Sequence, residues 1–354
     1  MNTSIAQQVR YLQRPEGRVS YTVEGSGPLV VAVPGMGDLR SSYRELVRPL
    51  LEAGYRVAVT DLRAHGDSDA GFRTFGDIAT GGDLLALIEE LGGPAVVLGN
   101  SMGAAAAAWA AAERPDLVSG LVLFGPLLRD PAMGRTAVAA MHGAYRVLFR
   151  GPWGAPAWGA YYRKVLNRGR TAPWLDEHVA AIRANLREPG RLRAFRHLTL
   201  QLTHAVVEPR LPEVSAPMLA FVGDLDPDFR DPATEAAWLE SVGAEVVRVA
   251  ECGHYPQAQR PDVVVPATLG FLAARRDAGW GAERDAGWGA ELGRGVGGGD
   301  GVDGGDGDAV GGGGGGAVDG IDGGAVDRGA ADSGAAVDDG AAGGAADADG
   351  SARA

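Results

Sequence analysis

One serine of the sequence has a context suited to covalent chemistry, with a glycine two residues before it and another two residues after it. Ser101 stands in the pentapeptide Gly-Asn-Ser-Met-Gly, residues 99–103. Because the chain has 56 glycines, such a match carries little weight without its context. An apolar run at 95–98 is typical of a buried strand, and the alanine-rich stretch at 102–113 is typical of a helix. A sharp strand–turn–helix junction exposes a serine hydroxyl, so the sequence predicts Ser101 as a nucleophile.

A serine hydroxyl attacks a carbonyl carbon efficiently only when a base removes its proton. His254 is the best placed of the six histidines, because a loop after the apolar run 246–249 reaches the carboxyl edge of a parallel sheet. His65 is expected to hold a turn within residues 61–68. The remaining histidines are expected to face solvent or neighbouring helices: His142, His178, His197 and His204.

An imidazole base needs a carboxylate that orients it and stabilises its cation. The turn after the apolar run 218–222 offers three aspartates. We predict Asp226 as the partner, with Asp224 and Asp228 as alternatives that would otherwise cap the turn. Asp130 is a more distant alternative.

The oxyanion of a tetrahedral intermediate needs preorganised donors. The backbone N–H of Met102, directly after the nucleophile, is one candidate. The second is Met36, in the Pro-Gly-Met-Gly sequence after the apolar run 29–33, although a simple turn has the same composition. The sequence shows no metal-ligand pattern and no phosphate-binding loop, so no cofactor and no metal are expected.

The patterns around these residues alternate between two periodicities. Strands are expected at 18–23, 29–33, 56–61, 95–98, 121–124, 218–222 and 246–249. Helices are expected at 43–51, 82–91, 102–113 and 263–274. This order predicts an α/β fold: a mostly parallel sheet with helices on both faces.

Four segments follow from the patterns and the composition. Residues 1–128 and 211–276 are expected to form the two halves of the core. Residues 129–210 lack strand patterns and are expected to form a helical lid over the strand ends. Residues 277–354 consist mainly of Gly, Ala and Asp and are expected to be disordered, because they contain too little apolar surface to offset the entropy of ordering.

Charge is distributed unevenly along the chain. The net charge is −12, but residues 277–354 hold 16 acidic and 4 basic residues, whereas residues 1–276 hold 29 of each. The expected lid has 14 basic and 5 acidic residues. The acidic balance therefore belongs to the expected tail and says little about the folded part.

Composition also bears on location and partners. The single cysteine, Cys252, excludes an internal disulfide and fits a reducing compartment. Neither a secretory leader nor a stretch long enough to span a bilayer is visible. We expect a cytoplasmic protein with a small-molecule substrate, no nucleic-acid partner and no membrane partner; the oligomeric state is unknown from sequence.

The order of these groups resembles the α/β-hydrolase superfamily over about residues 18–275. In that family the early loop often begins His-Gly, whereas here Pro34 precedes the glycine. The segment 61–68 resembles the family's Asp-x-Arg-Gly-x-Gly-x-Ser turn, with Ala64 in place of a glycine. The resemblance implies a catalytic triad of Ser101, Asp226 and His254. It also implies an oxyanion hole formed by the backbone N–H groups of Met36 and Met102.

The substrate is less sharply indicated than the mechanism. An aspartate nucleophile would suggest epoxide or haloalkane hydrolysis, and Ser101 argues against both. The elbow is similar to those of esterases, of carbon–carbon hydrolases acting on vinylogous diketones, and of cofactor-free perhydrolases. We expect hydrolysis of a small-molecule carboxylic ester or related acyl bond through an acyl-enzyme. A small-ligand receptor on the same fold is the non-enzymatic alternative.

Basic and aromatic residues lie together in the expected lid, for example Arg163 and Lys164 beside Tyr161 and Tyr162. One hypothesis is that they favour a substrate with an aromatic or acyl body and an anionic group. The alternative is a set of exposed basic helix faces over an apolar underside.

Overall fold

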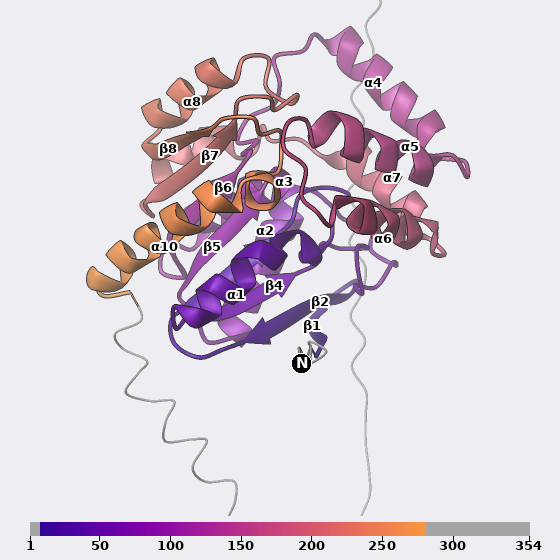
Figure 1. Ribbon diagram of the computed structural model, residues 1–354. Helices are drawn as coiled ribbons and strands as arrows, with labels where there is room; N and C mark the ends of the chain where they lie inside the picture. The colour runs from indigo at the N-terminus through magenta and orange to yellow at the C-terminus, as the bar shows by residue number, and fades with distance from the viewer. Residues whose placement is uncertain (1–7, 281–354) are drawn as a thin grey trace, which may run out of the picture. The chain divides into compact units, whose positions relative to one another are not determined.

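The computed structural model describes residues 8–280, and within them eight strands form one sheet (Figure 1). The spatial order is β1-β2-β4-β3-β5-β6-β7-β8. β2 runs antiparallel to β1 and β4, and every other neighbouring pair is parallel. The strands are β1 (Arg10–Arg14), β2 (Gly17–Glu24), β3 (Leu29–Val33), β4 (Arg56–Thr60), β5 (Ala95–Asn100), β6 (Val118–Phe124), β7 (Met218–Gly223) and β8 (Ala244–Val249). This confirms the predicted mostly parallel sheet.

Helices cover both faces of the sheet, as predicted. Outside the stretch between β6 and β7 they are α1 (Arg44–Glu52), α2 (Asp77–Glu90), α3 (Met102–Glu113), α8 (Pro232–Ser241), α9 (Pro256–Gln259) and α10 (Pro261–Asp277), with a short helix η1 (Arg40–Tyr43). The central strand β3 is buried along its whole length. Its alternate residues Val30 and Ala32 join a core with α1 and α10, whereas Val31 and Val33 join a core with α2, α3 and α8.

Several elements differ from the sequence-based prediction, among them the unpredicted helix α8, and for two of them the reason is identifiable. β1 was not predicted because its sequence RYLQR is mostly polar, and as an edge strand it buries only Leu12. α2 begins at Asp77, before the predicted start at residue 82, and runs through two glycines. Gly81 is required there because a Cβ at this position would lie 2.4 Å from the indole of Trp109. Tertiary packing of α2 on α3 thus overrides the low helix propensity of glycine.

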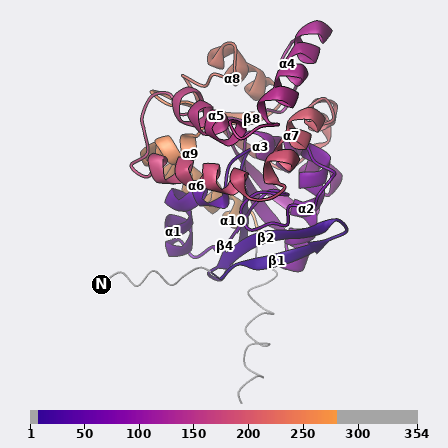
Figure 2. The ribbon, with the colours of Figure 1, turned by 90° about the vertical axis from the view of Figure 1, so that its right-hand side faces the viewer.

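The chain between β6 and β7 is helical (Figure 2). It contains α4 (Arg135–Leu148), α5 (Gly154–Tyr161), η2 (Tyr162–Leu166), α6 (Leu175–Arg187), α7 (Arg191–Gln201) and η3 (Glu208–Glu213). A separate apolar core holds these helices together, built around Trp158, Tyr162 and Phe195. That core also includes Tyr255, the residue after His254. The helical insertion therefore packs directly on the loop that carries the predicted base.

The described chain ends on a packed aromatic residue. α10 runs to Asp277, and Trp280 beyond it is 5 % exposed and stacks on Tyr55 at a centroid distance of 5.8 Å. Residues 281–354, where the prediction of disorder mainly falls, lie outside the described residues. Within residues 8–280, no helix has the length and apolar character needed to cross a membrane.

Candidate active site

Ser101 lies at the junction of β5 and α3 in a strained conformation. Its φ and ψ are 55° and −120°, a left-handed region that side chains rarely adopt. The flanking glycines are required by packing: a Cβ on Gly99 would lie 2.6 Å from the carbonyl oxygen of Gly103, and one on Gly103 would lie 2.6 Å from that of Val33. The turn thus has the geometry expected of a nucleophile elbow.

The predicted base and acid meet beside this elbow. His254 Nδ1 donates to Asp226 Oδ2 at 2.8 Å, and both residues are almost fully buried. His254 follows β8 and Asp226 follows β7, and the carboxyl ends of parallel neighbours lie at one edge of the sheet. Gly125 at the end of β6 completes the arrangement, because a Cβ there would lie 3.0 Å from both Asp226 Oδ2 and His254 Nδ1. Its φ of +49° is a second reason for glycine.

Asn100 ties the elbow to the histidine loop. Its side-chain Nδ2 donates to the carbonyl oxygens of Phe124 and His254, at 2.9 and 3.1 Å. The Ser101 backbone N–H also donates to Phe124, at 3.0 Å. The side chain of Asn100 thus has a structural role that sequence reasoning did not assign.

The Nε2 edge of His254 faces a second carboxylate. Asp228 Oδ2 lies 3.5 Å from Nε2, and Asp228 Oδ1 accepts from the phenol of Tyr161 on α5 at 3.4 Å. Among residues 8–280, no hydrogen bond joins the Ser101 hydroxyl to His254. Asp226 and Asp228, left open as alternatives by the sequence, therefore occupy opposite edges of one imidazole ring. Asp224 instead pairs with Arg248 at 2.6 Å.

Both carboxylates influence the protonation of the ring. Burial disfavours the charged imidazolium, but Asp226 and Asp228 outweigh this and raise the pKa of His254 to about 9. Burial is also the main cause of a raised pKa for Asp228, and the neighbouring Asp226 raises it further. The resting site at neutral pH therefore favours a protonated His254 that donates a hydrogen bond to Asp226 and forms an ion pair with Asp228.

The loop that carries Met36 is held tightly against the elbow. A Cβ on Gly35 would lie 2.9 Å from the Ser101 Cβ. The N–H of Gly37 donates to His65 Nε2 at 3.1 Å, and the carbonyl of Gly37 accepts from the Trp158 indole at 2.9 Å. Within residues 8–280, the backbone N–H groups of Met36 and Met102 have no acceptor, so both are available to a ligand.

Two histidines outside the predicted triad position this loop. His65 is buried, and its Nδ1–H donates to the carbonyl oxygen of Arg63 at 2.8 Å, which leaves Nε2 as an acceptor. Burial lowers the pKa of His65 and keeps it neutral in this role. The turn-holding role predicted for His65 agrees with this geometry. Ala64, next to His65, has a φ of 59°. This left-handed conformation favours glycine, which explains the glycine at this position of the family's Asp-x-Arg-Gly-x-Gly-x-Ser turn.

His178 faces neighbouring helices, one of the two alternatives expected for it. It is fully buried rather than open to solvent, and its Nε2 lies 2.6 Å from Asp38 Oδ1. Its Nδ1 lies 3.1 Å from the Ser41 hydroxyl. His178 thus links α6 of the insertion to the loop of Met36. The contact joins residues 140 positions apart, so no local pattern could reveal it.

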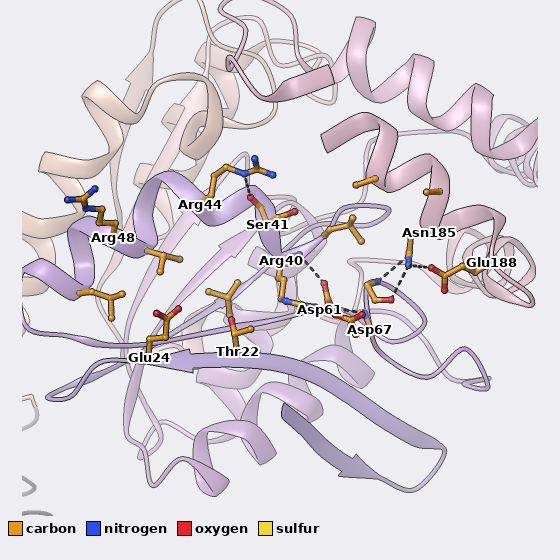
Figure 3. A pocket seen from close by; sticks show the side chains of 17 residues that line it. Thr22, Glu24, Arg40, Ser41, Arg44, Arg48, Asp61, Asp67, Asn185 and Glu188 are labelled. Atoms are coloured by element: carbon orange, nitrogen blue, oxygen red, sulfur yellow. Dashed lines mark hydrogen bonds and ion pairs between the residues drawn. The ribbon is translucent and has the colours of Figure 1, made fainter. Parts of the chain in front are cut away.

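A cavity of about 770 Å³ lies outside this constellation (Figure 3). Its walls come from η1 and α1, from β2 and β4, and from α6. Arg40 crosses it to pair with Asp61 and Asp67, and Asn185 of α6 exchanges two hydrogen bonds with the backbone of Gly66. Ser101 and His254 are not among its lining residues. We interpret these contacts as a brace between the insertion and the core.

The charged cluster at His254 also has the composition of a metal site. Asp226, Asp228 and His254 each offer a ligand atom, and these atoms lie within 4.8 Å of one another. However, the two carboxylates contact different ring nitrogens, so a cation bound to either nitrogen would replace a proton and break one contact. The arrangement suits a doubly paired imidazole better than a metal centre.

Comparison with known proteins identifies the family. A model described as "Alpha/beta hydrolase family" matches residues 30–267, which is more than half of the chain. The chain belongs to the alpha/beta hydrolase family. It is an enzyme of this fold, a hydrolase.

Individual relatives of this hydrolase carry several activities in their names. A soluble epoxide hydrolase from Corynebacterium sp. (strain C12) is 26 % identical, over 73 % of this chain and 95 % of its own. A 2-hydroxy-6-oxononadienedioate/2-hydroxy-6-oxononatrienedioate hydrolase from Comamonas testosteroni is 28 % identical over 72 % and 91 %. Epoxide hydrolase 3 from Siraitia grosvenorii is 36 % identical, but the match spans only 32 % of its length and 28 % of this chain.

Solved structures agree on the fold. A putative lipase from Acinetobacter baumannii AYE superposes with a TM-score of 0.64 at 18 % identity, covering 77 % of this chain and 93 % of its own. An esterase from Thermogutta terrifontis superposes with a TM-score of 0.62 at 23 % identity, covering 76 % and 99 %. At these identities the likeness concerns the architecture, which confirms the predicted fold class.

Proposed function

We propose that the protein is a serine hydrolase that cleaves a small-molecule carboxylic ester or related acyl bond. Ser101 acts as the nucleophile, His254 as the base, and Asp226 as the group that orients the base. The single observation that carries the proposal is the buried 2.8 Å contact between His254 Nδ1 and Asp226, made beside a strained elbow that carries Ser101. Several relatives are named epoxide hydrolases, but the elbow residue here is a serine rather than an aspartate.

The proposed reaction has two steps. Ser101 Oγ attacks the carbonyl carbon while Nε2 of neutral His254 takes its proton, and the N–H groups of Met36 and Met102 stabilise the oxyanion. Collapse of this intermediate expels the alcohol, which takes the proton from His254 and leaves an acyl-enzyme. Water, deprotonated by His254, then attacks the acyl carbon and releases the acid and Ser101.

The charged groups around the site favour a substrate without a negative charge near the ring. Arg163 and Arg170, basic residues of the insertion, are engaged with Asp176 at 2.5 Å and Glu251 at 3.5 Å. The carboxylate that faces the reacting edge of His254 is Asp228. We therefore favour the alternative that the basic residues of the insertion form exposed helix faces.

Covalent labelling tests the proposal. A fluorophosphonate should add its phosphonyl group to the wild-type protein, and mass spectrometry of peptides should place it on Ser101. Ser101→Ala should show no labelling and no hydrolysis across a panel of esters and lactones. Folded wild-type protein that is never labelled would contradict the proposal and favour a ligand receptor on this fold.

Carbon–carbon hydrolysis is a second candidate. The match to the Comamonas testosteroni hydrolase, which covers 91 % of that protein, favours it. Adding vinylogous diketones to the same panel separates the two reactions. A kcat/KM for these diketones well above that for esters, lost in Ser101→Ala, would assign the carbon–carbon reaction.

A further inference from the structure

α4 has an unusual environment for a helix of a folded protein. None of its residues is buried, although most of its side chains are apolar or small. Val138, Met141, Tyr145 and Leu148, spaced three or four residues apart, are half-buried and form the face toward the rest of the insertion. The opposite face is solvent-exposed (Figures 1 and 2), and Val147 on it is 66 % exposed.

A cationic cleft runs along one side of this helix. A cavity of about 350 Å³ is lined by Arg146 and Arg150 of α4 and its C-terminal end, and by Arg196, His197 and Leu200 of α7. Within the described residues, none of the three arginines has a hydrogen-bond or ion-pair partner for its side chain. Elsewhere in the described part of the chain most arginines are paired, for example Arg40 with Asp61 and Arg191 with Glu188.

No acidic residue offsets these charges locally. The sequence from Pro131 to Leu175 contains no Asp or Glu, and neither does α7. Three guanidinium groups held close together repel one another, so an anionic ligand would stabilise the cleft.

Exposed apolar side chains lie at both ends of α4, two of them close in the chain to the arginines of the cleft. Trp153 is 54 % exposed, and its ring lies over Gly151, next to Arg150 in the chain. Val147 belongs to the same turn of α4, and Met133, 43 % exposed, lies just before the helix. A helix with arginines on one flank and an exposed aliphatic residue on the adjoining face, followed in the chain by an exposed Trp, has features typical of segments that lie on bilayer surfaces.

We propose that this surface, formed by Met133, Arg146, Val147, Arg150, Trp153 and Arg196, docks onto a phospholipid bilayer that carries anionic headgroups. The arginines contact headgroup phosphates, and the apolar residues enter the boundary between headgroups and acyl chains. Binding at the surface needs no spanning helix. The proposal departs from the sequence-based expectation of no membrane partner, which rested on the lack of a stretch long enough to span a bilayer. The proposal is independent of the reaction at Ser101.

A second copy of the chain fits this surface less well. A two-fold symmetric contact would place the arginines of one copy near those of the other without any acidic residue between them. A small phosphorylated ligand would use the cleft, but it would leave the exposed Val147 and Trp153 without a role. Only an extended surface with both phosphates and an apolar interior uses both features.

Vesicle sedimentation of the full chain tests the proposal. The wild-type protein should bind vesicles that contain phosphatidylglycerol, bind those of phosphatidylcholine alone much more weakly, and lose affinity as salt rises. Arg146→Gln/Arg150→Gln/Arg196→Gln should lower the partition coefficient on the order of 100-fold, about fivefold per charge. Val147→Ser/Trp153→Ser should lower it roughly tenfold or more.

A matched control removes three exposed charges elsewhere. The control variant is Arg10→Gln/Arg48→Gln/Arg276→Gln. Its three positions lie on β1, α1 and α10, elements that are away from α4 in both views (Figures 1 and 2). Its partition coefficient should stay within about twofold of the wild-type value. Circular dichroism melts establish that each variant folds. Should Arg196→Gln disturb α7, the Arg146→Gln/Arg150→Gln variant alone still tests the cleft, with an expected decrease of about 25-fold.

Several outcomes would overturn the proposal. One is a wild-type protein that ignores phosphatidylglycerol vesicles at low salt. Another is equal loss of binding in the cleft variant and the matched control. Unchanged vesicle binding in Val147→Ser/Trp153→Ser would refute entry of the apolar residues into the bilayer and would reduce the interaction to headgroup phosphates at the arginine cleft. A dimer in light scattering that this same variant dissociates would assign the surface to a second copy.

Discussion

Asp228→Asn should make the enzyme more active at neutral pH. In the structure Asp228 Oδ2 lies 3.5 Å from His254 Nε2, the nitrogen that accepts the proton of Ser101 in the proposed mechanism. With both carboxylates ionised the pKa of His254 is about 9, so only about 1 % of the imidazole is neutral at pH 7. Removing one carboxylate charge lowers this pKa and increases the fraction of competent base.

The size of the effect follows from the separation of the charges. At 3.5 Å two unit charges interact by about 1 kcal/mol in water and about 5 kcal/mol at an effective dielectric constant near 20. These energies correspond to roughly 1 to 3 pKa units. The Asp228 side chain is 26 % exposed and its own pKa is raised, so part of the charge is screened or neutralised. We expect the lower end, about one unit.

The assay is the pH profile of kcat/KM, which reports groups of the free enzyme. Because neutral His254 is the active form, activity rises as pH increases through its pKa. In Asp228→Asn this acidic limb should move about one unit to lower pH, with roughly tenfold higher kcat/KM at pH 7.

Asp224→Asn is the matched control for this prediction. It removes the same charge from the same loop, but Asp224 pairs with Arg248 at 2.6 Å rather than with the ring. Its acidic limb should stay where the wild-type limb is. If the limbs of Asp228→Asn and the wild type coincide, Asp228 does not influence the base and the electrostatic reasoning fails.

Three further predictions concern packing around the site. Gly125→Ala should lower kcat/KM for esters on the order of 100-fold, because the new Cβ would lie 3.0 Å from Asp226 Oδ2 and from His254 Nδ1. Gly134→Ala is the control, since its Cβ would have nothing within 4 Å. Its kcat/KM in the same assay should match that of the wild type. His178→Phe should lower the free energy of unfolding by about 1–3 kcal/mol in urea titrations, because buried Asp38 loses its imidazole partner. An unchanged midpoint would show that this contact contributes nothing. Trp280→Ala should cost about 3 kcal/mol in the same titration, since the indole is 5 % exposed, and a loss below measurement error would place it outside the folded unit.

Some of the candidate site is predictable because it is encoded locally. The elbow needs a buried strand, small residues on both sides of Ser101 and a helix start, and all of these lie within residues 95–113. The sheet is predictable for a similar reason, since a strand buried on both faces has a continuous apolar sequence, as β3 does. The polar edge strand β1 has no such signature and was missed.

Other features depend on the conformation of loops and on contacts between distant segments. Asp226 and Asp228 are equivalent by type and nearly so by position, and only the turn conformation sends them to opposite edges of the His254 ring. A shift of the loop by a few ångströms would exchange their roles, and no composition rule can resolve that distance.

The loop that carries Met36 is likewise held by contacts between distant segments. His178 and Asp38 meet only because the insertion folds back onto the core. The local sequence around a histidine on an amphipathic helix is the same whether its side chain is exposed to solvent or packed against another part of the fold. The sequence alone therefore predicted the proposed nucleophile and the order of the proposed triad, and it determined the layers of the sheet. Tertiary structure decided the electrostatic environment of the imidazole, because electrostatic interactions depend on distances that separate parts of the chain set together.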